Sequence, residues 1–279
     1  MRHANIAVDI TPYLEEDMGT GDLTACIIPA SINAVAEVIT REPAVICGQE
    51  WFAAVFNFLA ADVRLDWLVS EGQSVSANTP LCKLAGPARA LLTGERTALN
   101  LLQTMSATAT ISRQYADAVA GTGCKVLDTR KTIPGLRLAQ KYAVTCGGCY
   151  NHRVGLYDGI LIKENHIIAA GSIAQAIQSA RAFSSVPVEV EVENLLEFEQ
   201  AIAAQPDRIM LDNFSLIDMR LAVALNAGAI ELEASGNVDL QTIRTVAETG
   251  VDYISVGALT KHIDAIDLSM RIKLVVNNG

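Results

Sequence analysis

The chain has 279 residues, 51% of them hydrophobic and 19% charged, and its 31 Asp and Glu outnumber its 21 Lys and Arg by ten. This length fits two domains, or one barrel with an extension, and the apolar content suits a parallel sheet with a well-filled core. A net charge of −10 argues against general nucleic-acid binding, because such binding neutralises many phosphates with cations.

Neither a membrane segment nor an export signal is expected. The apolar runs are short and broken by charge, which argues against a transmembrane helix. Residues 1–17 lack the succession of basic, apolar and small residues that marks a signal peptide. The six cysteines have no framework spacing, which is typical of thiols in a cytoplasmic protein.

The first part of the chain mixes helical and strand-like segments. In chain order we expect a short capped helix within 11–24, strands over 34–40 and 44–48, a helix over 48–62 and a pair of strands within 63–86. The helix over 48–62 carries an apolar stripe of Trp51, Phe52, Val55, Phe56 and Leu59. Residues 88–119 predict a helix in two pieces, broken near Ser106–Thr110.

From Lys125 onward, strands and helices alternate at a step of roughly 20–35 residues, the size of a βα unit. The expected strands are 125–129, 159–163, 187–193, 208–213, 229–235 and 253–257, and the helices between them are 136–144, 172–183, 195–204, 216–226 and 240–249. Six such units in a row favour a barrel over an open sheet. A last helix over 265–276 either closes the barrel or returns to the N-terminal domain.

Residues 124–166 reverse the sign of the chain, with seven Lys and Arg against three Asp and Glu, and also contain His152 and His166. A cationic cluster in an anionic chain repels itself unless an anion binds there. A solvated face with scattered ion pairs is the plainer interpretation. We favour anion binding, because these cations follow strand ends and do not recur at the spacing of a helix surface.

The ends of the predicted strands form one constellation, because parallel strands of a barrel all end on the same side. In order, the strand ends are Asp128–Lys131, Lys163–His166, Glu191, Asp212–Asn213, Glu233–Asn237 and Val256–Ala258. The early strands end in cations and the middle strands in carboxylates. This arrangement predicts a site for a small polyanion beside a group that is carried with a divalent metal.

Two Gly-containing loops add a second signal. ASGN leads into a helix expected from Val238, and SVGALT leads into another helix, so both offer backbone N–H groups at helix starts. Each loop is a weak signal alone, but two in succession opposite a cation cluster predict a phosphate site.

Several residues admit other interpretations. Lys163 at a strand end suits a Schiff-base lysine of an aldolase-type barrel, although the cations are too numerous for one carbonyl. Cys146 and Cys149 form a CxxC without a second pair at zinc spacing, so neither a zinc site nor a redox role is favoured. Glu189, Glu191 and Glu193 share one strand face, and of these Glu191 is expected to contact the ligand.

Motifs along nearly the whole chain resemble the quinolinate phosphoribosyltransferase family. In order they are EEDMGTGDLT, GERTALNLLQ, LDTRKTIPGLR, GGCYNHRVGLYDG, LIKENH, VEVEVENL, LDNF, LEASGN and SVGALTK. The LDTRKT and GG-x-x-NHR-x-GLYD blocks are the most specific. The chain departs from the family pattern at Cys149 and Tyr150, and at Lys261-His262, where His-Ser is common.

The resemblance implies an α/β fold of two domains. Residues 1–108 would form an open-faced α/β sandwich, with a C-terminal helix over 264–279 packed on it, and residues 109–263 an incomplete α/β barrel of six or seven strands. It also implies conversion of quinolinate and phosphoribosyl pyrophosphate (PRPP) into nicotinate mononucleotide, CO2 and pyrophosphate, with Mg2+ as cofactor. The expected assembly is a homodimer with shared active sites, or a higher assembly built from such dimers, with neither nucleic acid nor membrane as a partner.

By resemblance, quinolinate binding falls to Arg130, Lys131, His152, Arg153 and Lys163, joined by Arg41 and Arg96 from the other subunit. PRPP binding falls to Glu191, Asp212, Ser235, Gly236, Asn237, Gly257, Ala258 and Lys261, with Lys261 or His262 on the phosphate. Lys131, Lys163, Glu191 and Asp212 are the expected catalytic residues, and Glu191 and Asp212 would meet Mg2+ together with pyrophosphate.

Two further rivals remain open from the sequence. One is a paralogous phosphoribosyltransferase of the type associated with molybdenum transport, which acts on another substrate. The other is a non-catalytic sensor of acidic metabolites, which ligand binding would stabilise without releasing pyrophosphate.

Overall fold

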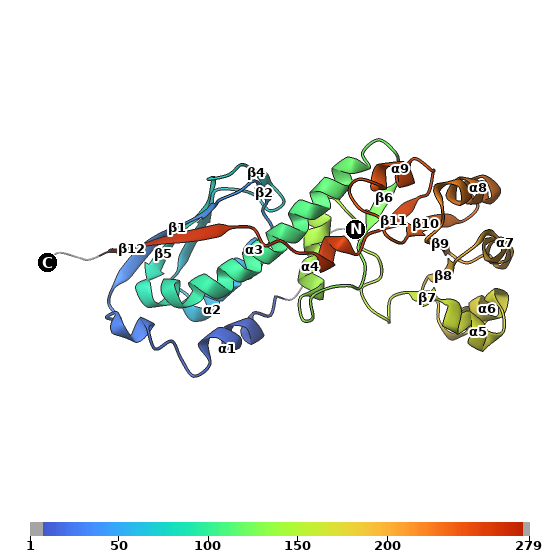
Figure 1. Cartoon of the computed structure of the whole chain (residues 1–279). Helices are drawn as coiled ribbons and strands as arrows, with labels where there is room; N and C mark the ends of the chain where they lie inside the picture. Colours follow the sequence, from blue (N-terminus) through green and yellow to red (C-terminus); the bar gives the residue numbers. More distant parts are fainter. Residues whose placement is uncertain (1–7, 276–279) are drawn as a thin grey trace. The chain divides into compact units, whose positions relative to one another are not determined.

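The computed structural model describes residues 8–275, which belong to two compact units (Figure 1). The chain passes from the first unit to the second between Ile111 and Ser112, and returns to the first between His262 and Ile263. Within residues 8–275, no helix has both the length and the apolar character needed to cross a membrane.

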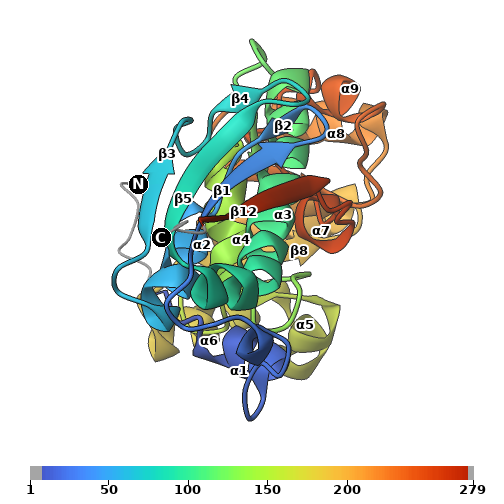
Figure 2. The same ribbon diagram turned by 90° about the vertical axis from the view of Figure 1, so that its left-hand side faces the viewer.

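The first unit is built on a four-stranded antiparallel sheet in the order β12-β1-β5-β3. Its strands are β1 (Asn33–Thr40), β3 (Arg64–Trp67), β5 (Pro80–Pro87) and β12 (Leu268–Val275). A separate pair joins β2 (Ala44–Val45) to β4 (Ser74–Val75). Figure 2 shows these strands side by side, with helices α2 and α3 behind them.

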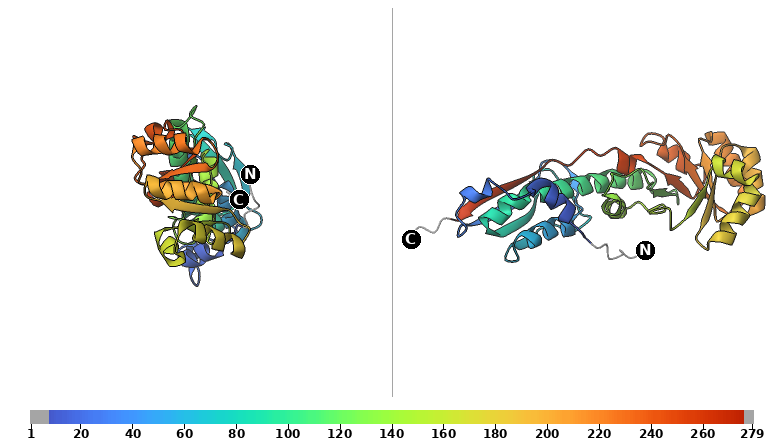
Figure 3. Two further views of the ribbon diagram at one scale, coloured as in Figure 1. Left: turned by 90° about the vertical axis from the view of Figure 1, so that its right-hand side faces the viewer. Right: turned by 90° about the horizontal axis from the view of Figure 1, so that it is seen from below.

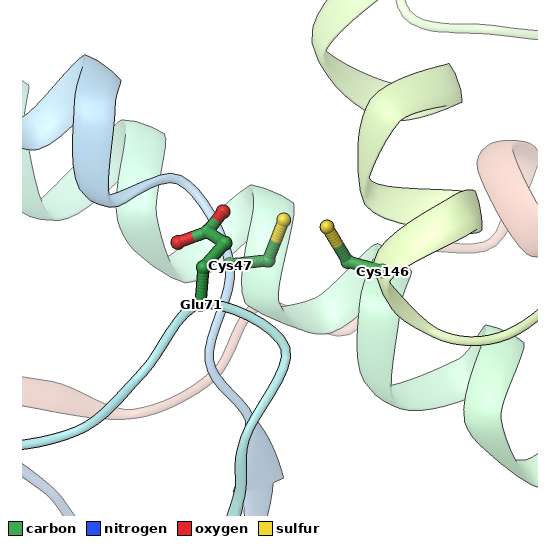
Figure 4. A group of neighbouring side chains, drawn as sticks. All are labelled: Cys47, Glu71 and Cys146. Atoms are coloured by element: carbon green, nitrogen blue, oxygen red, sulfur yellow. The ribbon is translucent and has the colours of Figure 1, made fainter. Parts of the chain in front are cut away.

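The helices of this unit are α1 (Thr11–Met18), the short 3-10 helix η1 (Ala25–Ile27), α2 (Gln49–Leu59) and α3 (Ala88–Ala118). The predicted stripe of α2 is buried at Trp51, Phe52, Val55 and Phe56 and half-buried at Leu59. The Glu71 carboxylate accepts the N–H groups of Gly48 and Gln49, at 2.7 and 3.1 Å, beside Cys47 (Figure 4). A negative side chain thus stabilises the positive end of α2.

The predicted break near Ser106–Thr110 is wrong, because α3 runs unbroken from Ala88 to Ala118. The hydroxyls of Thr108 and Thr110 donate to carbonyls one turn back, and Ser106 Oγ exchanges hydrogen bonds with the backbone of Cys47. Hydroxyls satisfied in this way do not compete with the helix.

The predicted C-terminal helix over 264–279 is also wrong where the structure describes it. Residues 268–275 form β12, which pairs with β1 from Leu268 opposite Thr40 to Val275 opposite Asn33. Leu268 and Met270 are buried, and Arg271 between the apolar positions is exposed. Alternation of period two, together with an available strand edge, outweighs the helix preference of the segment. Residues 276–279 lie outside the described part.

The second unit carries six parallel strands in the order β6-β11-β10-β9-β8-β7, which confirms the predicted α/β class. They are β6 (Lys125–Leu127), β7 (Ile160–Ile162), β8 (Val188–Val192), β9 (Arg208–Asp212), β10 (Glu231–Ser235) and β11 (Tyr253–Ser255). Tyr150 adds a single parallel bridge at Leu127, on the free side of β6. Among the described residues β6 and β7 do not pair, so the barrel is incomplete.

Helices connect these strands: α4 (Arg137–Cys146), α5 (Glu164–Ala170), α6 (Ile173–Phe183), α7 (Leu195–Ala204), α8 (Leu216–Asn226), α9 (Ile243–Ala247) and α10 (Ala258–Lys261). Figures 1 and 3 show α6, α7 and α8 together on one side of the sheet. Ser172, Asn194 and Ser215 begin these three helices, and each side chain accepts the N–H three residues on.

Candidate functional site

The strand ends of the second unit meet at one edge, as their parallel direction requires. The register places Ser235 beside Asp212 and Ser255 beside Leu127. This edge, which we call the mouth, therefore gathers the segments that follow the six strands.

A buried ion pair anchors the first of these segments. Lys141 on α4 pairs with Asp128, whose side chain is fully buried, and also donates to the carbonyl of His152. Asn151 Nδ2 donates to Asp128 Oδ2 at 2.6 Å, and His152 N donates to Asp128 Oδ1 at 2.9 Å. Burial raises the pKa of Asp128 and lowers the pKa of Lys141, while their mutual attraction opposes both shifts. Removing either partner would leave a buried charge alone, at a cost of roughly 3–5 kcal/mol.

Four charged or titratable side chains, His152, Glu189, Arg208 and Glu233, meet beneath the mouth, and we call them the inner quartet. His152 Nε2 lies 2.8 Å from Glu189 Oε2 and 3.5 Å from Glu233 Oε2. Arg208 donates to Glu233 at 3.1 Å. Glu233 is fully buried and Glu189 is 7% exposed.

Burial and neighbouring charges shift the titration of the inner quartet. Burial and the nearby Glu189 carboxylate raise the pKa of Glu233 to about 7. Burial lowers the pKa of His152, but the hydrogen bond to Glu189 and the charges of Glu233 and Glu189 outweigh it, so the net shift is upward. Protons therefore bind the quartet more tightly than they bind the free side chains.

Two arginines carry positive charge at the level of the mouth. Arg153 donates to the carbonyl of Gly159 at 3.0 Å. Burial and the charge of Arg130 lower the pKa of Arg153. The Nε of Arg130 is buried and has no hydrogen-bond partner among residues 8–275. Two guanidiniums near each other, one with an unused buried N–H, are suited to an anion that accepts several hydrogen bonds.

Carboxylates stand at the ends of β8 and β9: Glu191 is the next-to-last residue of β8, and Asp212 is the last residue of β9. Lys163, after β7, pairs with Glu191 on the neighbouring strand. Asp212 Oδ2 accepts a hydrogen bond from Asn213 Nδ2 at 2.8 Å. An ammonium paired with a carboxylate and 48% exposed is not the desolvated amine of a Schiff-base lysine, so this pairing disfavours the aldolase interpretation.

The loops after β9 and β10 fit tightly together. Asn213, Gly236 and Asn237 all have positive φ, of 54°, 103° and 49°. Asn213 N donates to the carbonyl of Ser235 at 2.9 Å, and a Cβ on Gly236 would lie 2.7 Å from Asn213 Cγ. The Ser235–Asn237 loop therefore depends on glycine and on its neighbour Asn213.

The helix expected from Val238 is wrong at its start, because α9 begins only at Ile243. Asp239 Oδ1 accepts the N–H groups of Gln241 and Thr242, each at 2.9 Å. These donors are engaged within the protein, so an anion would have to use the Ser235–Asn237 loop itself.

Gly257 and Ala258 begin α10, as the second loop predicted. A Cβ on Gly257 would lie 3.0 Å from Lys131 Cδ, so the missing side chain leaves room for the stem of Lys131. Thr260 Oγ1 donates to the carbonyl of Lys131 at 2.8 Å, which joins the loops after β6 and β11. Lys261 is exposed in the last turn of α10, beside His262.

Arg41 and Arg96, predicted to serve a partner's site, belong to the first unit. Arg41 follows β1 and its N–H donates to the carbonyl of Asp267 at 2.8 Å. Arg96 is exposed on α3.

The structure shows contacts of residues to which the sequence assigned no role in binding. Asp128 and Lys141 hold the NHR segment, Glu189, Arg208 and Glu233 surround His152, and Asn213 supports Gly236. One signal was available for Glu189: it lies two residues before Glu191, so the two side chains share one face of the strand.

Neither the CxxC nor a glutamate-lined hollow of this unit suits a polyanion. Cys149 is buried and donates to the carbonyl of Ser112 at 3.1 Å, and burial raises the pKa of its thiol to about 12. The hollow, of about 460 Å³, opens between α5 and α7, and four glutamates line it: Glu164, Glu191, Glu193 and Glu197.

Comparison with known proteins finds relatives over nearly the whole chain. The family model described as quinolinate phosphoribosyl transferase, N-terminal domain, matches residues 22–106, and the C-terminal domain model matches residues 108–271. The solved nicotinate-nucleotide pyrophosphorylase of Francisella tularensis has 50% identity and a TM-score of 0.92, with 95% of this chain and 94% of that chain covered.

Curated relatives give the same result. The probable carboxylating nicotinate-nucleotide pyrophosphorylase of Synechocystis is 43% identical over 265 residues, which cover 93% of this chain and 90% of that protein. The protein of that name in Bacillus subtilis is 40% identical, over 98% of this chain and 96% of that protein. The chain belongs to the quinolinate phosphoribosyl transferase family.

Proposed function

We propose that this protein joins quinolinate to the ribose of PRPP at the mouth of the barrel, with loss of CO2 and pyrophosphate, to give nicotinate mononucleotide. The protein is a phosphoribosyltransferase of NAD biosynthesis. The observation that carries the site assignment is the buried Arg130 Nε, which has no partner within residues 8–275 and lies near the like-charged Arg153.

Quinolinate is a dicarboxylate, and forked guanidinium groups match carboxylate geometry. Arg130 and Arg153 would bind its carboxylates, with Lys131 and Lys163 as point charges toward carboxylate and pyrophosphate. His152 supports this set from below, since both of its ring nitrogens contact protein groups.

For PRPP, the assignment is by position along the mouth. Glu191 and Asp212 would meet the ribose hydroxyls, and the loops Ser235–Asn237 and Gly257–Ala258 would hold the 5′-phosphate with backbone N–H groups. Lys261, exposed at the end of α10, adds charge on the same side.

The chemistry we infer needs no protein nucleophile. The pyridine nitrogen forms a bond to ribose C1 while the bond from C1 to the pyrophosphate oxygen breaks. The bond between C2 of the resulting pyridinium and its carboxylate then breaks, and CO2 leaves. The electron pair of that bond stays on C2, which takes up a proton. The chain positions the two substrates, neutralises the pyrophosphate with Lys131 and Lys163, and faces the positive ribose with Glu191 and Asp212.

Mg2+ is the cofactor we propose, and the donor set suits it. Glu191 and Asp212 are carboxylates at the ends of the neighbouring strands β8 and β9, and oxygen ligands of this kind are what Mg2+ prefers beside phosphates. The ion would neutralise the pyrophosphate charge.

We also propose a cytoplasmic homodimer in which Arg41 and Arg96 of one subunit serve the partner's mouth. The cysteine pattern supports the compartment, and the exposure of Arg96 on α3 supports its contact with a partner. Inactive R96A and K163A proteins, unfolded and refolded together, should regain about a quarter of the wild-type rate, because half of the dimers are mixed and each carries one intact site. A mixture as inactive as its components would contradict shared sites.

The activity itself is tested by supplying PRPP, Mg2+ and quinolinate and measuring CO2 and pyrophosphate. The molybdenum-type paralogue predicts no quinolinate dependence, and the sensor predicts thermal stabilisation by quinolinate without any release.

A further inference from the structure

Burying the inner quartet costs more free energy than a purely structural role would justify. Taking charged groups out of water costs several kcal/mol each, and apolar residues of similar volume often fill such space with equal or greater stability. Glu189 lies two residues before Glu191 on β8, so it occupies the same face one step below the mouth. Its Oε1 is buried with no hydrogen-bond partner among residues 8–275.

The bonds around His152 define one tautomer. Nδ1 accepts the N–H of Arg153 at 2.8 Å, so Nδ1 carries no proton in this arrangement. The proton is therefore on Nε2, which donates to Glu189 Oε2 at 2.8 Å. The charged groups facing the ring are Glu189 on β8, Glu233 on β10 and Arg208 on β9, while Asp128 holds the backbone N–H.

These contacts form a relay to a substrate-binding residue. We propose that Glu189 is a positioning residue that acts on Arg153 through His152. Glu189 fixes the imidazole in the tautomer with the proton on Nε2. The unprotonated Nδ1 then accepts the backbone N–H of Arg153 and holds it in place. The relay rests on the proposed function, since Arg153 is taken as a quinolinate ligand. It makes quinolinate affinity depend on a carboxylate that does not reach the substrate.

The test compares E189L, which has no acceptor, with E189Q, whose amide oxygen still accepts from Nε2. E189L should raise the KM for quinolinate about tenfold and leave the KM for PRPP and kcat within about twofold, because only one substrate's ligand is misplaced. E189Q should restore most of the loss. E193Q, the same change at an exposed position just beyond β8, is the matched control.

Nitrogen NMR of His152 gives a readout that does not require activity. At a pH high enough for the ring to be neutral, wild-type and E189Q protein should show a pyridine-like Nδ1 and a pyrrole-like Nε2, and E189L should show a mixture of tautomers. If E189L fails to fold, E189Q alone decides through its retained tautomer and near-normal KM.

Three results would overturn the relay: an unchanged quinolinate KM in E189L, an unchanged tautomer signal in E189L, or a stoichiometric transition metal in dialysed wild-type protein that E189Q loses. The metal result would make His152, Glu189 and Glu233 a metal site, for which their spacing is close enough. Absence of quinolinate turnover in the wild type would refute the proposed function, and the tautomer signal would still test the link from Glu189 to His152.

Discussion

Glu233 shows how a single buried residue couples stability to pH. Its pKa in the folded state is raised from 4.5 to about 7, so the folded protein binds this proton more tightly than the unfolded chain does. The folded state therefore loses relative stability as pH rises from about 4.5 through 7. His152, whose pKa is also raised, contributes in the same direction.

Replacing Glu233 by Gln should flatten this dependence. One pKa unit corresponds to about 1.4 kcal/mol. Between pH 5 and pH 8 the unfolding free energy of the wild type should therefore fall by about 1–3 kcal/mol relative to that of E233Q. Urea unfolding at both pH values measures it. E231Q is the control, since Glu231 also accepts from Arg208 but is exposed. If the unfolding free energies of wild type and E233Q changed with pH in parallel, the folded protein would not bind a proton more tightly at Glu233.

At the scale of elements, the loops after β9 and β10 act as one piece, because Asn213 fills the space beside Gly236. G236A should raise the KM for PRPP and lower unfolding free energy by about 1–3 kcal/mol, since it combines a clash with positive φ. G228A is the matched control: Gly228 also has positive φ, 77°, but a Cβ there meets nothing within 4 Å.

The control should therefore show only the backbone strain and an unchanged KM for PRPP. Steady-state kinetics and urea unfolding of both variants separate the two effects. Equal losses in G236A and G228A would mean that the contact with Asn213 contributes nothing to the loop.

Local sequence patterns predicted the parallel strands and the segments that follow them, because apolar runs ending in charge are a local signal. They failed where a distant partner decides the outcome. Residues 268–275 become a strand because β1 offers its edge, and α3 stays intact through Ser106 because the hydroxyl reaches Cys47, 59 residues away. The roles of Glu189 and Glu233 were hidden for the same reason, since His152 and Glu189 are 37 residues apart.

At the scale of the whole molecule, an acidic chain places three cations, Arg130, Lys131 and Lys163, after strands that end at one edge of a parallel sheet. Family membership explains why the two domain models follow each other along the chain with one residue between them. Family membership does not assign individual side chains. The assignment we propose depends on Arg130 Nε, which has no hydrogen-bond partner within residues 8–275, and on the Asp128–Lys141 ion pair nearby in the chain.

The central claim is that the strand-end cations hold a diacid against a sugar pyrophosphate, and parallel measurement of CO2 and pyrophosphate release tests it most directly. With PRPP and Mg2+, wild-type protein should release the two products in equal amounts only when quinolinate is present. R130A should lower kcat/KM for quinolinate by about 100-fold or more without loss of fold. Pyrophosphate release that does not depend on quinolinate, or near-normal turnover in a folded R130A protein, would contradict the claim.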